Sequence, residues 1–168
     1  MSNRAKKLFI FFTVVVPFLI YSIVYYAPII RNAPFKAKEF VSLKYRWGVG
    51  THLDNSYDSS TGVYQYLDQD DSLIVKHIKL TAADTKLLDS VADRQGFWNL
   101  PPQIANKEED IKASKSVRYY MEFNYKKKSK IVTYVSDFKG TPKMKDAAAQ
   151  MQKVIEQTLI DAESRQGK

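Results

Sequence analysis

The chain has 168 residues, a formal net charge of +8 and no cysteine. The missing cysteines exclude disulfides, a thiol nucleophile, a lipid-modified cysteine and a cysteine-ligated metal. The length suits one domain with its own hydrophobic core, and the mild basic excess fits either an ordinary soluble surface or attraction to an anionic lipid surface or envelope polyanion.

The first element is an uncharged stretch at residues 8–30, LFIFFTVVVPFLIYSIVYYAPII. As a helix it would measure roughly 34 Å, which is longer than the ~30 Å hydrocarbon core of a bilayer. Pro17 is tolerated in a membrane-spanning helix, and Tyr25 and Tyr26 suit the membrane interface. The sequence therefore predicts a transmembrane anchor at residues 8–30, with the lipid bilayer as its partner.

The alternative for this stretch is a cleaved signal peptide. Such a peptide has an apolar core of about 7–15 residues and small residues before its cleavage site. The apolar core here is longer, and proline follows both Ala27 and Ala33, which disfavours cleavage after either. We therefore expect an uncleaved anchor between a basic tail at residues 1–7 and a linker at residues 31–39.

Basic residues flank the anchor on both sides, so the positive-inside rule gives little contrast. A short basic N-terminus is nevertheless the usual cytoplasmic end of a signal anchor. We therefore expect a single-pass protein of the cell membrane whose globular domain, residues 40–168, lies outside the cytoplasm. The flanking basic residues are Arg4, Lys6 and Lys7 before the anchor and Arg31, Lys36 and Lys38 after it.

Alternation of apolar and polar residues predicts the strands of the domain. In residues 40–47 every second side chain from Val41 to Trp47 is apolar, and residues 117–125 repeat this pattern. A period of two is typical of a half-buried strand. The stretch at residues 51–62 is rich in Asp, Asn, Ser and Gly and is predicted to be a loop. The predicted strands are residues 40–47, 62–67, 73–80, 117–125 and 130–135.

Two helices are predicted from their end signals. Thr81 and Asp84 have the spacing of a capping box, and Gly96 stands at the expected end of the same helix. Thr141 and Pro142 begin the second helix as its cap and its first residue. The apolar stripe of this second helix consists of Met144, Ala147, Ala148, Met151, Val154, Ile155, Thr158, Leu159 and Ala162.

The order of these elements is a strand, a hairpin and a helix, then a second hairpin and helix. Short turns between strands imply antiparallel pairing, and the apolar face of such a sheet needs a cover. We therefore predict an α+β fold in which an antiparallel sheet of about five strands (β-ββα-ββα) is covered on one face by two helices. The polar residues 103–116 are expected to form a mobile connection.

The only histidines are His52 and His77. Neither is accompanied by the G-x-S-x-G turn of a hydrolase. An enzyme that used the loop at residues 51–62 would need His52 beside Asp54 or Asp58 in a concave pocket.

Other polar clusters have explanations that need no ligand. The acidic turn at residues 68–71 lacks the spacing of an EF-hand, so turn formation accounts for it without calcium. Lysines at residues 126–130 belong to a hairpin tip, where solvation accounts for them without nucleic acid or lipid. Ser114 and Lys115 have the residue types of a Ser/Lys hydrolase, but a catalytic lysine needs burial. We expect no metal, no cofactor and no nucleic-acid partner.

Aromatic residues make up 13% of the chain, and some must lie on the sheet face away from the helices. There they would form either a platform for a protein or glycan or cross-strand pairs that stabilise the sheet. The candidate interaction surface consists of Tyr64, Tyr66, Tyr120 and Tyr134.

Three runs carry a resemblance to known proteins: YRWGVG at residues 45–50, NSYDSSTGVYQY at 55–66 and GFWNLP at 96–101. In these runs the chain resembles an uncharacterised family of exported or membrane-anchored bacterial proteins that share a repeated hairpin–helix (ββα) domain. The resemblance implies an envelope location and carries over no activity, ligand or site residue. Type IV pilins also begin with a short basic leader and an apolar helix, but here no Gly precedes Phe11 and the helix contains no acidic residue.

These observations favour a non-enzymatic, single-pass protein of the cell envelope whose α+β domain binds another protein or an envelope polymer. The predicted anchor, the short linker, the aromatic residues and the lack of a catalytic set support this hypothesis. The alternative is a membrane-anchored hydrolase or other enzyme that uses the loop at residues 51–62.

Overall fold

The computed structural model describes residues 4, 9–32, 35–50, 52–113 and 115–166. The chain divides into two compact units, Met1–Pro34 and Phe35–Lys168. Most of the predicted tail at residues 1–7 lies outside the described residues, as do residues 33 and 34 of the predicted linker.

The first unit is helical through most of the predicted anchor. A π-helical turn, η1, covers Phe11–Val15, and α2 covers Val16–Asn32. Most of the large apolar side chains between Phe9 and Tyr26 are 49–67% exposed. Within the described residues, no helix has both the length and the apolar character that crossing a membrane requires.

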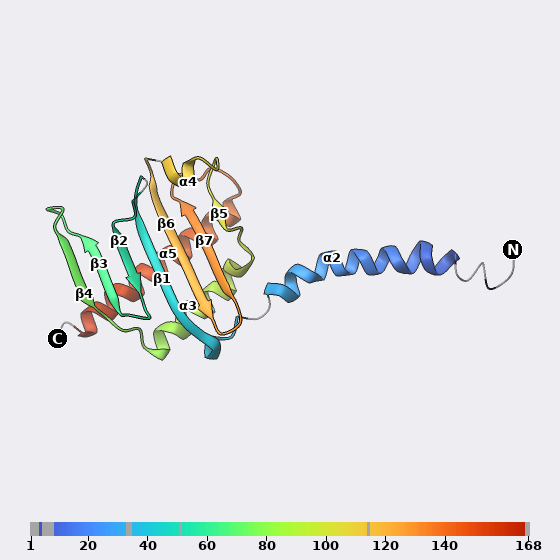
Figure 1. Ribbon diagram of the computed structural model, residues 1–168, viewed down its shortest axis with the longest axis horizontal. Helices are drawn as coiled ribbons and strands as arrows, with labels where there is room; N and C mark the ends of the chain where they lie inside the picture. The colour runs from blue at the N-terminus through green and yellow to red at the C-terminus, as the bar shows by residue number, and fades with distance from the viewer. Residues whose placement is uncertain (1–3, 5–8, 33–34, 51, 114, 167–168) are drawn as a thin grey trace. The chain divides into compact units, whose positions relative to one another are not determined.

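In the described part of the second unit, seven strands form one mixed sheet with the order β4-β3-β2-β1-β6-β7-β5 (Figure 1). Neighbouring strands are antiparallel, except that β5 runs parallel to β7. β1 and β6 form the longest pair, which extends from Phe40 opposite Tyr125 to Val49 opposite Val117. The strands are β1 (Phe40–Val49), β2 (Asn55–Asp58), β3 (Val63–Leu67), β4 (Leu73–His77), β5 (Gln103–Ile104), β6 (Val117–Tyr125) and β7 (Ser129–Val135).

Two long helices cover one face of this sheet (Figure 1). The core between the helices and the sheet includes Leu88, Met151, Ile155, Tyr45 and Met121, each at most 1% exposed. Burying one such side chain contributes about 1.5–3 kcal/mol relative to leaving it in water. We call the opposite face, over which the described chain places no long helix, the open face. The helices are α3 (Ala82–Gln95) and α5 (Pro142–Gln166), and the shorter helical segments are η2 (Ala37–Glu39), η3 (Phe97–Asn99) and α4 (Asp110–Ala113).

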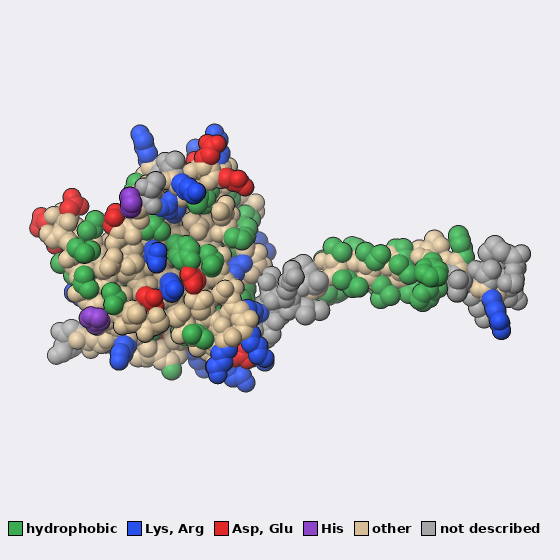
Figure 2. All heavy atoms as spheres, viewed as in Figure 1, with side chains coloured by type: hydrophobic (Ala, Val, Ile, Leu, Met, Phe, Trp, Pro, Cys, Tyr) green, Lys and Arg blue, Asp and Glu red, His purple; other side chains and the backbone are tan. Residues whose placement is uncertain are grey.

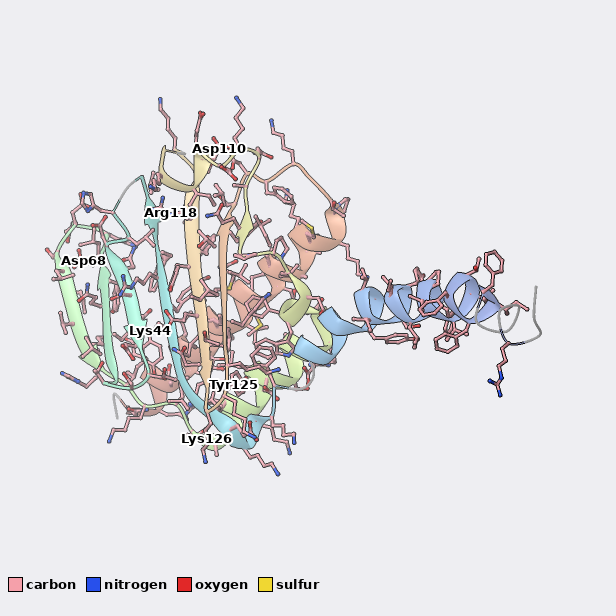
Figure 3. The ribbon with its side chains drawn as sticks, turned by 45° about the vertical axis from the view of Figure 1, so that its right-hand side comes forward. Lys44, Asp68, Asp110, Arg118, Tyr125 and Lys126 are labelled. Carbon is pink, nitrogen blue, oxygen red and sulfur yellow. The ribbon has the colours of Figure 1, made fainter. Side chains whose placement is uncertain are left out.

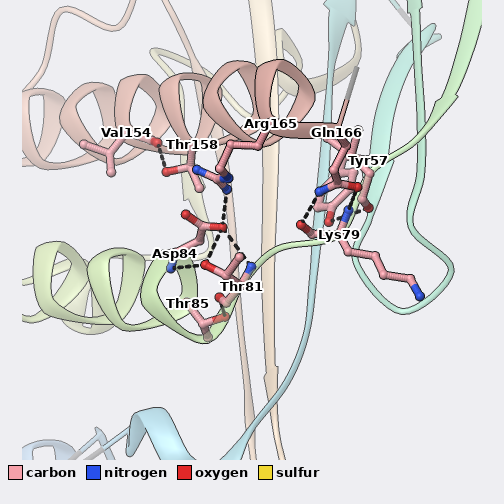
Figure 4. Close-up of polar contacts among 10 residues, drawn as sticks. Tyr57, Lys79, Thr81, Asp84, Thr85, Val154, Thr158, Arg165 and Gln166 are labelled. Atoms are coloured by element: carbon pink, nitrogen blue, oxygen red, sulfur yellow. Dashed lines mark hydrogen bonds and ion pairs between the residues drawn. The ribbon is translucent and has the colours of Figure 1, made fainter. Parts of the chain in front are cut away.

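The start of α3 confirms the predicted capping box. Thr81 Oγ1 accepts a hydrogen bond from the Asp84 backbone N–H at 3.2 Å, and Asp84 Oδ2 accepts one from the Thr81 backbone N–H at 2.8 Å (Figure 4). The same carboxylate lies 2.6 Å from Nη2 of Arg165 near the end of α5. At its other end, α3 stops at Gly96 in the left-handed conformation, with φ 67°. The local signals in the sequence therefore determine both ends of this helix.

The sheet contains two strands that the sequence analysis did not predict. β2 lies inside the stretch that was expected to be a loop, and Tyr57, its one apolar residue, is 1% exposed. A single apolar residue gives no alternation, so the pattern did not reveal this strand. β5 and α4 lie within residues 103–116, which were expected to form a mobile connection. Because β5 is parallel to β7, the sheet is mixed rather than purely antiparallel.

The described domain begins at Phe35, before the first strand. The Phe35 side chain is 5% exposed, and its ring centroid lies 4.0 Å from that of Trp98 in a stacked arrangement. It also meets the ring of Tyr125 edge-on at 5.0 Å. Phe35 is therefore part of the hydrophobic core, although it falls within the predicted linker.

Candidate functional site

The central strands present polar side chains of both charges on the open face. β1 contributes Lys44 and Arg46, and β6 contributes Tyr120, Glu122 and Asn124, all in the strand phase opposite to the buried core residues. Figure 2 views the molecule from this side and shows basic and acidic side chains next to one another over the middle of the sheet. This part of the face therefore suits a polar ligand better than an apolar one.

Three of the open-face side chains form a row across neighbouring strands. Arg46 of β1 lies opposite Tyr120 of β6, and Tyr120 lies opposite Thr133 of β7. Residues in such cross-strand pairs have Cβ atoms only ~4.5–5.5 Å apart. A guanidinium, a phenol and a hydroxyl are thus held side by side, and together they form the floor of a cavity.

Gly48 allows a loop to lie close to the sheet beside this row. A Cβ atom at Gly48 would lie 3.0 Å from the carbonyl oxygen of His52, 3.1 Å from Cα of Leu53 and 3.2 Å from the backbone nitrogen of Asp54. All three are backbone atoms, so no side-chain rotation would relieve the contact. The absence of a side chain at Gly48 therefore lets His52 and Leu53 form one wall of the cavity.

α4 forms a second wall, and Arg118 connects it to the sheet. Nη1 of Arg118 donates a hydrogen bond to the carbonyl oxygen of Ile111 in α4. Arg118 is 7% exposed, and this burial lowers the pKa of its guanidinium. Because the ordinary pKa of arginine is above about 12, the group stays cationic at neutral pH. The bond keeps α4 in place, where Ile111 and Lys112 line the cavity.

The resulting cavity has a volume of about 530 Å³, which is within the usual range for small-ligand sites. Arg46, Lys112 and Arg118 bring positive charge to it from three separate elements, and none of the described lining residues is acidic. Figure 3 shows Arg118 near the start of β6 and Asp110 above it at the start of α4. Asp110 Oδ2 accepts a hydrogen bond from the backbone N–H of Lys107 at 3.0 Å. The lining consists of Arg46, His52, Leu53, Ile111, Lys112, Arg118, Tyr120 and Thr133.

Glu122 balances part of the positive charge next to the cavity. Its carboxylate accepts hydrogen bonds from the Tyr120 hydroxyl at 2.6 Å and from Nδ2 of Asn124 at 2.8 Å. Burial alone would raise the pKa of Glu122, but these two bonds and the charges of Lys44 and Arg46 hold that pKa below its usual value. Burial, together with the Glu122 carboxylate, raises the pKa of Tyr120 to about 12. The phenol is therefore a neutral donor at physiological pH, and its orientation is fixed by Glu122.

The cavity is suited to binding an anion. An arginine side chain presents its N–H groups in a fork that matches carboxylate and phosphate oxygens, and lysine adds a mobile point charge. The side chains of Leu53 and Ile111 give the same cavity an apolar part. The combination fits a ligand in which a carboxylate or phosphate is attached to a less polar group.

The enzyme alternative receives no support from the positions of its predicted residues. His52 lines the cavity, but neither Asp54 nor Asp58 does. The Asp58 carboxylate accepts hydrogen bonds from the side chain of Ser60 at 2.5 Å and from its backbone N–H at 2.8 Å. Ser114 lies outside the described residues. In the described parts of the chain, no cluster of three or more His, Cys, Asp or Glu side chains is arranged to hold a metal ion.

The four tyrosines of the candidate interaction surface lie in different environments. Tyr64 and Tyr134 are 8% and 3% exposed, in the core beneath the helices. Tyr66 is half-buried on the same side, with its hydroxyl 3.5 Å from Oε1 of Glu163 in α5. Tyr64 pairs with the buried Tyr57, and this register turns both Tyr64 and Tyr66 toward the helices rather than outward. Tyr120 alone of the four lies on the open face.

The basic residues of the cavity were not predicted from the sequence. Arg46 and Arg118 both occupy the polar phase of clearly alternating strands, so their position on the open face could have been expected. The proximity of these two arginines could not have been expected, because it depends on the pairing of β1 with β6, which are far apart in the chain.

No protein-family model matches the chain, and no curated protein matches it at a significant level. The resemblance described for residues 45–50, 55–66 and 96–101 therefore stays a prediction.

Proposed function

We propose that the chain is a membrane-attached, non-enzymatic binding protein that recognises an anionic group of an envelope protein or polymer in the cavity on the open face. The observation that carries the proposal is the convergence of Arg46, Lys112 and Arg118 on one cavity whose described lining contains no acidic residue. The proposed site binds its ligand through charge and hydrogen bonds, and no covalent step is involved.

The proposed membrane attachment is supported by the exposed apolar side chains of the first unit. Side chains such as Phe12, Phe18 and Val24 are 59–67% exposed there. Each Å² of apolar surface left in water costs roughly 25 cal/mol, and a bilayer removes this cost. In this proposal the short basic N-terminus stays in the cytoplasm and the domain lies outside it.

The composition of the cavity defines what the ligand should look like. A carboxylate or phosphate would interact with the guanidinium of Arg46 and the ammonium of Lys112, while a ring or aliphatic part would contact Leu53 and Ile111. The Tyr120 ring on the floor offers a surface for a sugar ring. A polymer of acidic sugars has both kinds of group in each repeat.

The proposal is tested by measuring binding of the full chain, held in lipid nanodiscs, to a carboxylated polysaccharide and to a neutral one. We expect the carboxylated polymer to bind more tightly. The double substitution Arg46→Gln and Lys112→Gln should weaken that binding about a hundred-fold or more, since each lost charge-assisted hydrogen bond costs roughly 1.5–3 kcal/mol. Arg118 is left unchanged because it also holds α4 through Ile111.

A matched control removes the same charge from another element. Lys143→Gln with Lys145→Gln changes two side chains of α5 that do not line the cavity. Equal weakening by both double substitutions would show a nonspecific charge effect and contradict the proposal. Equal affinity for the neutral and the carboxylated polymer would contradict it as well.

A further inference from the structure

A second group of basic side chains lies at the other end of β6. Lys126 and Lys127 follow β6 in the β6–β7 turn, whereas Lys36 and Lys38 belong to the segment before β1, and all four are exposed. The backbone N–H of Lys126 donates to the carbonyl oxygen of Glu39 at 2.9 Å, which joins the two segments. We call these four lysines the basic cluster. Figure 3 shows Lys126 at the end of the sheet opposite to Arg118.

Aromatic packing fixes the two segments of the cluster to one another. Nζ of Lys128 lies 4.0 Å from the ring centroid of Phe35, in the geometry of a cation–π interaction. Phe35 itself is buried against Trp98 and Tyr125. The β6–β7 turn and the chain segment that begins at Phe35 therefore form one continuous surface.

This surface has a clear excess of positive charge. Glu39 is the only acidic residue in the two segments, residues 35–40 and 125–130. Two acids of α3 pack against aromatic residues at this end and are already engaged by them. Asp89 Oδ1 accepts a hydrogen bond from the Tyr125 hydroxyl at 2.6 Å, and Asp93 Oδ1 accepts one from the indole N–H of Trp98.

We propose that the basic cluster binds the anionic phospholipid headgroups of the membrane to which the chain is attached. The inference rests on the proposed attachment through residues 8–30. The chain from Ile30 to Lys36 spans at most roughly 22 Å, and the headgroup layer extends roughly 5–8 Å beyond the hydrocarbon. Lys36 and Lys38 are therefore held within reach of the headgroups by the chain itself, and the fold brings Lys126 and Lys127 to the same place.

The test compares the full chain in vesicles of phosphatidylcholine with the full chain in vesicles that also contain phosphatidylglycerol. The acetylation rate of each lysine is measured by mass spectrometry. We expect the anionic vesicles to slow acetylation of the basic cluster about five-fold or more. The attraction of an anionic leaflet for each nearby lysine shifts the equilibrium toward the lipid-bound side chain by about that factor. High salt should abolish the difference by screening. Lys112 and Lys143, on other elements, should react at the same rate in both vesicles.

Two matched double variants distinguish an effect of the basic cluster from an effect of the protein's overall charge. Lys126→Gln with Lys127→Gln should return the rates of Lys36 and Lys38 in anionic vesicles toward those in neutral vesicles, whereas Lys143→Gln with Lys145→Gln should leave them unchanged. If the chain floats with both kinds of vesicle but its basic cluster is acetylated at equal rates in them, the proposed headgroup contact is wrong and the proposed attachment still stands. A chain that floats with neither would overturn both. If inorganic phosphate slowed acetylation of the basic cluster in neutral vesicles, the cluster would bind a soluble anion instead of lipid.

Discussion

Gly48 determines where the loop wall of the cavity lies. A methyl group at this position would approach three backbone atoms of residues 52–54 at 3.0–3.2 Å. Gly48→Ala should therefore displace the loop, lower the free energy of unfolding by about 1–3 kcal/mol and weaken binding of the carboxylated polymer. Chemical denaturation and the binding assay measure the two effects. Val49→Ala, a change at a side chain that is 54% exposed, is the control and should alter neither. Unchanged binding in Gly48→Ala would show that this loop is not needed.

Asp89 is a residue whose charge works against the folded state. It is 8% exposed, and burial raises the pKa of its carboxyl even though the Tyr125 hydroxyl donates to it and so acts in the opposite direction. An acid with a raised folded-state pKa favours folding while it is protonated. That contribution is lost as the pH rises from the unfolded-state value of 3.8 through the higher folded-state value.

Asp89→Asn removes this titration but keeps a side-chain oxygen that can accept the hydrogen bond from Tyr125. We expect the free energy of unfolding at neutral pH to stay the same or rise slightly, and its fall just above pH 3.8 to become shallower. Tyr125→Phe removes the donor instead and should cost about 1–3 kcal/mol, because a buried acceptor loses its partner. Urea unfolding at a series of pH values measures both variants. A large loss of stability in Asp89→Asn at neutral pH would show that the charge itself is required.

The two long helices are joined at one end by contacts between α3, α5 and the segment before α3. Asp84 both caps α3 and pairs with Arg165 of α5 (Figure 4). One residue further, the Gln166 side chain accepts from the backbone N–H of Lys79 at 3.0 Å and donates to the Lys79 carbonyl oxygen at 2.8 Å. The end of α5 is thus attached both to α3 and to the chain that leads into it.

Arg165→Gln should lower the free energy of unfolding by about 1 kcal/mol, the usual upper value for a pair with one exposed partner. Asp84→Ala should cost more, about 2 kcal/mol, because the cap is lost together with the pair. Denaturant unfolding of both single variants and of the double variant measures the coupling. Arg94→Gln, an exposed change on α3, is the control. If Arg165→Gln and Arg94→Gln cost the same, the ion pair contributes nothing to stability.

The elements that the sequence predicted well are those whose signals are local. β6 has the predicted bounds, and the alternation of β1 correctly places Tyr45 in the core and Arg46 outside. β2 was missed because Tyr57 is its single apolar residue, and β5 because two residues give no pattern. Both short strands are held by pairing with neighbours, and this information is not contained in their own residues.

At the scale of the whole molecule, neither basic site could have been predicted. Arg46 and Arg118 line one cavity because β1 pairs with β6, and Lys126 lies beside the segment that precedes β1 because its backbone N–H donates to Glu39. Both arrangements bring together segments that are far apart in the chain. The types of these side chains followed from the sequence, but which of them lie together depended on the order of the strands.

The position of β1 also determines how the domain responds to force. β1 is the first strand in the chain and lies inside the sheet between β2 and β6. A pull on the chain ahead of Phe40 runs along β1, and the two strands paired with β1 resist it through their backbone hydrogen bonds. The load then falls in shear on all the hydrogen bonds between β1 and its neighbours at once, instead of opening them one after another. The inner position of β1 therefore makes the domain resist a pull on its N-terminal end with two rows of hydrogen bonds, where a strand at the sheet edge would offer one.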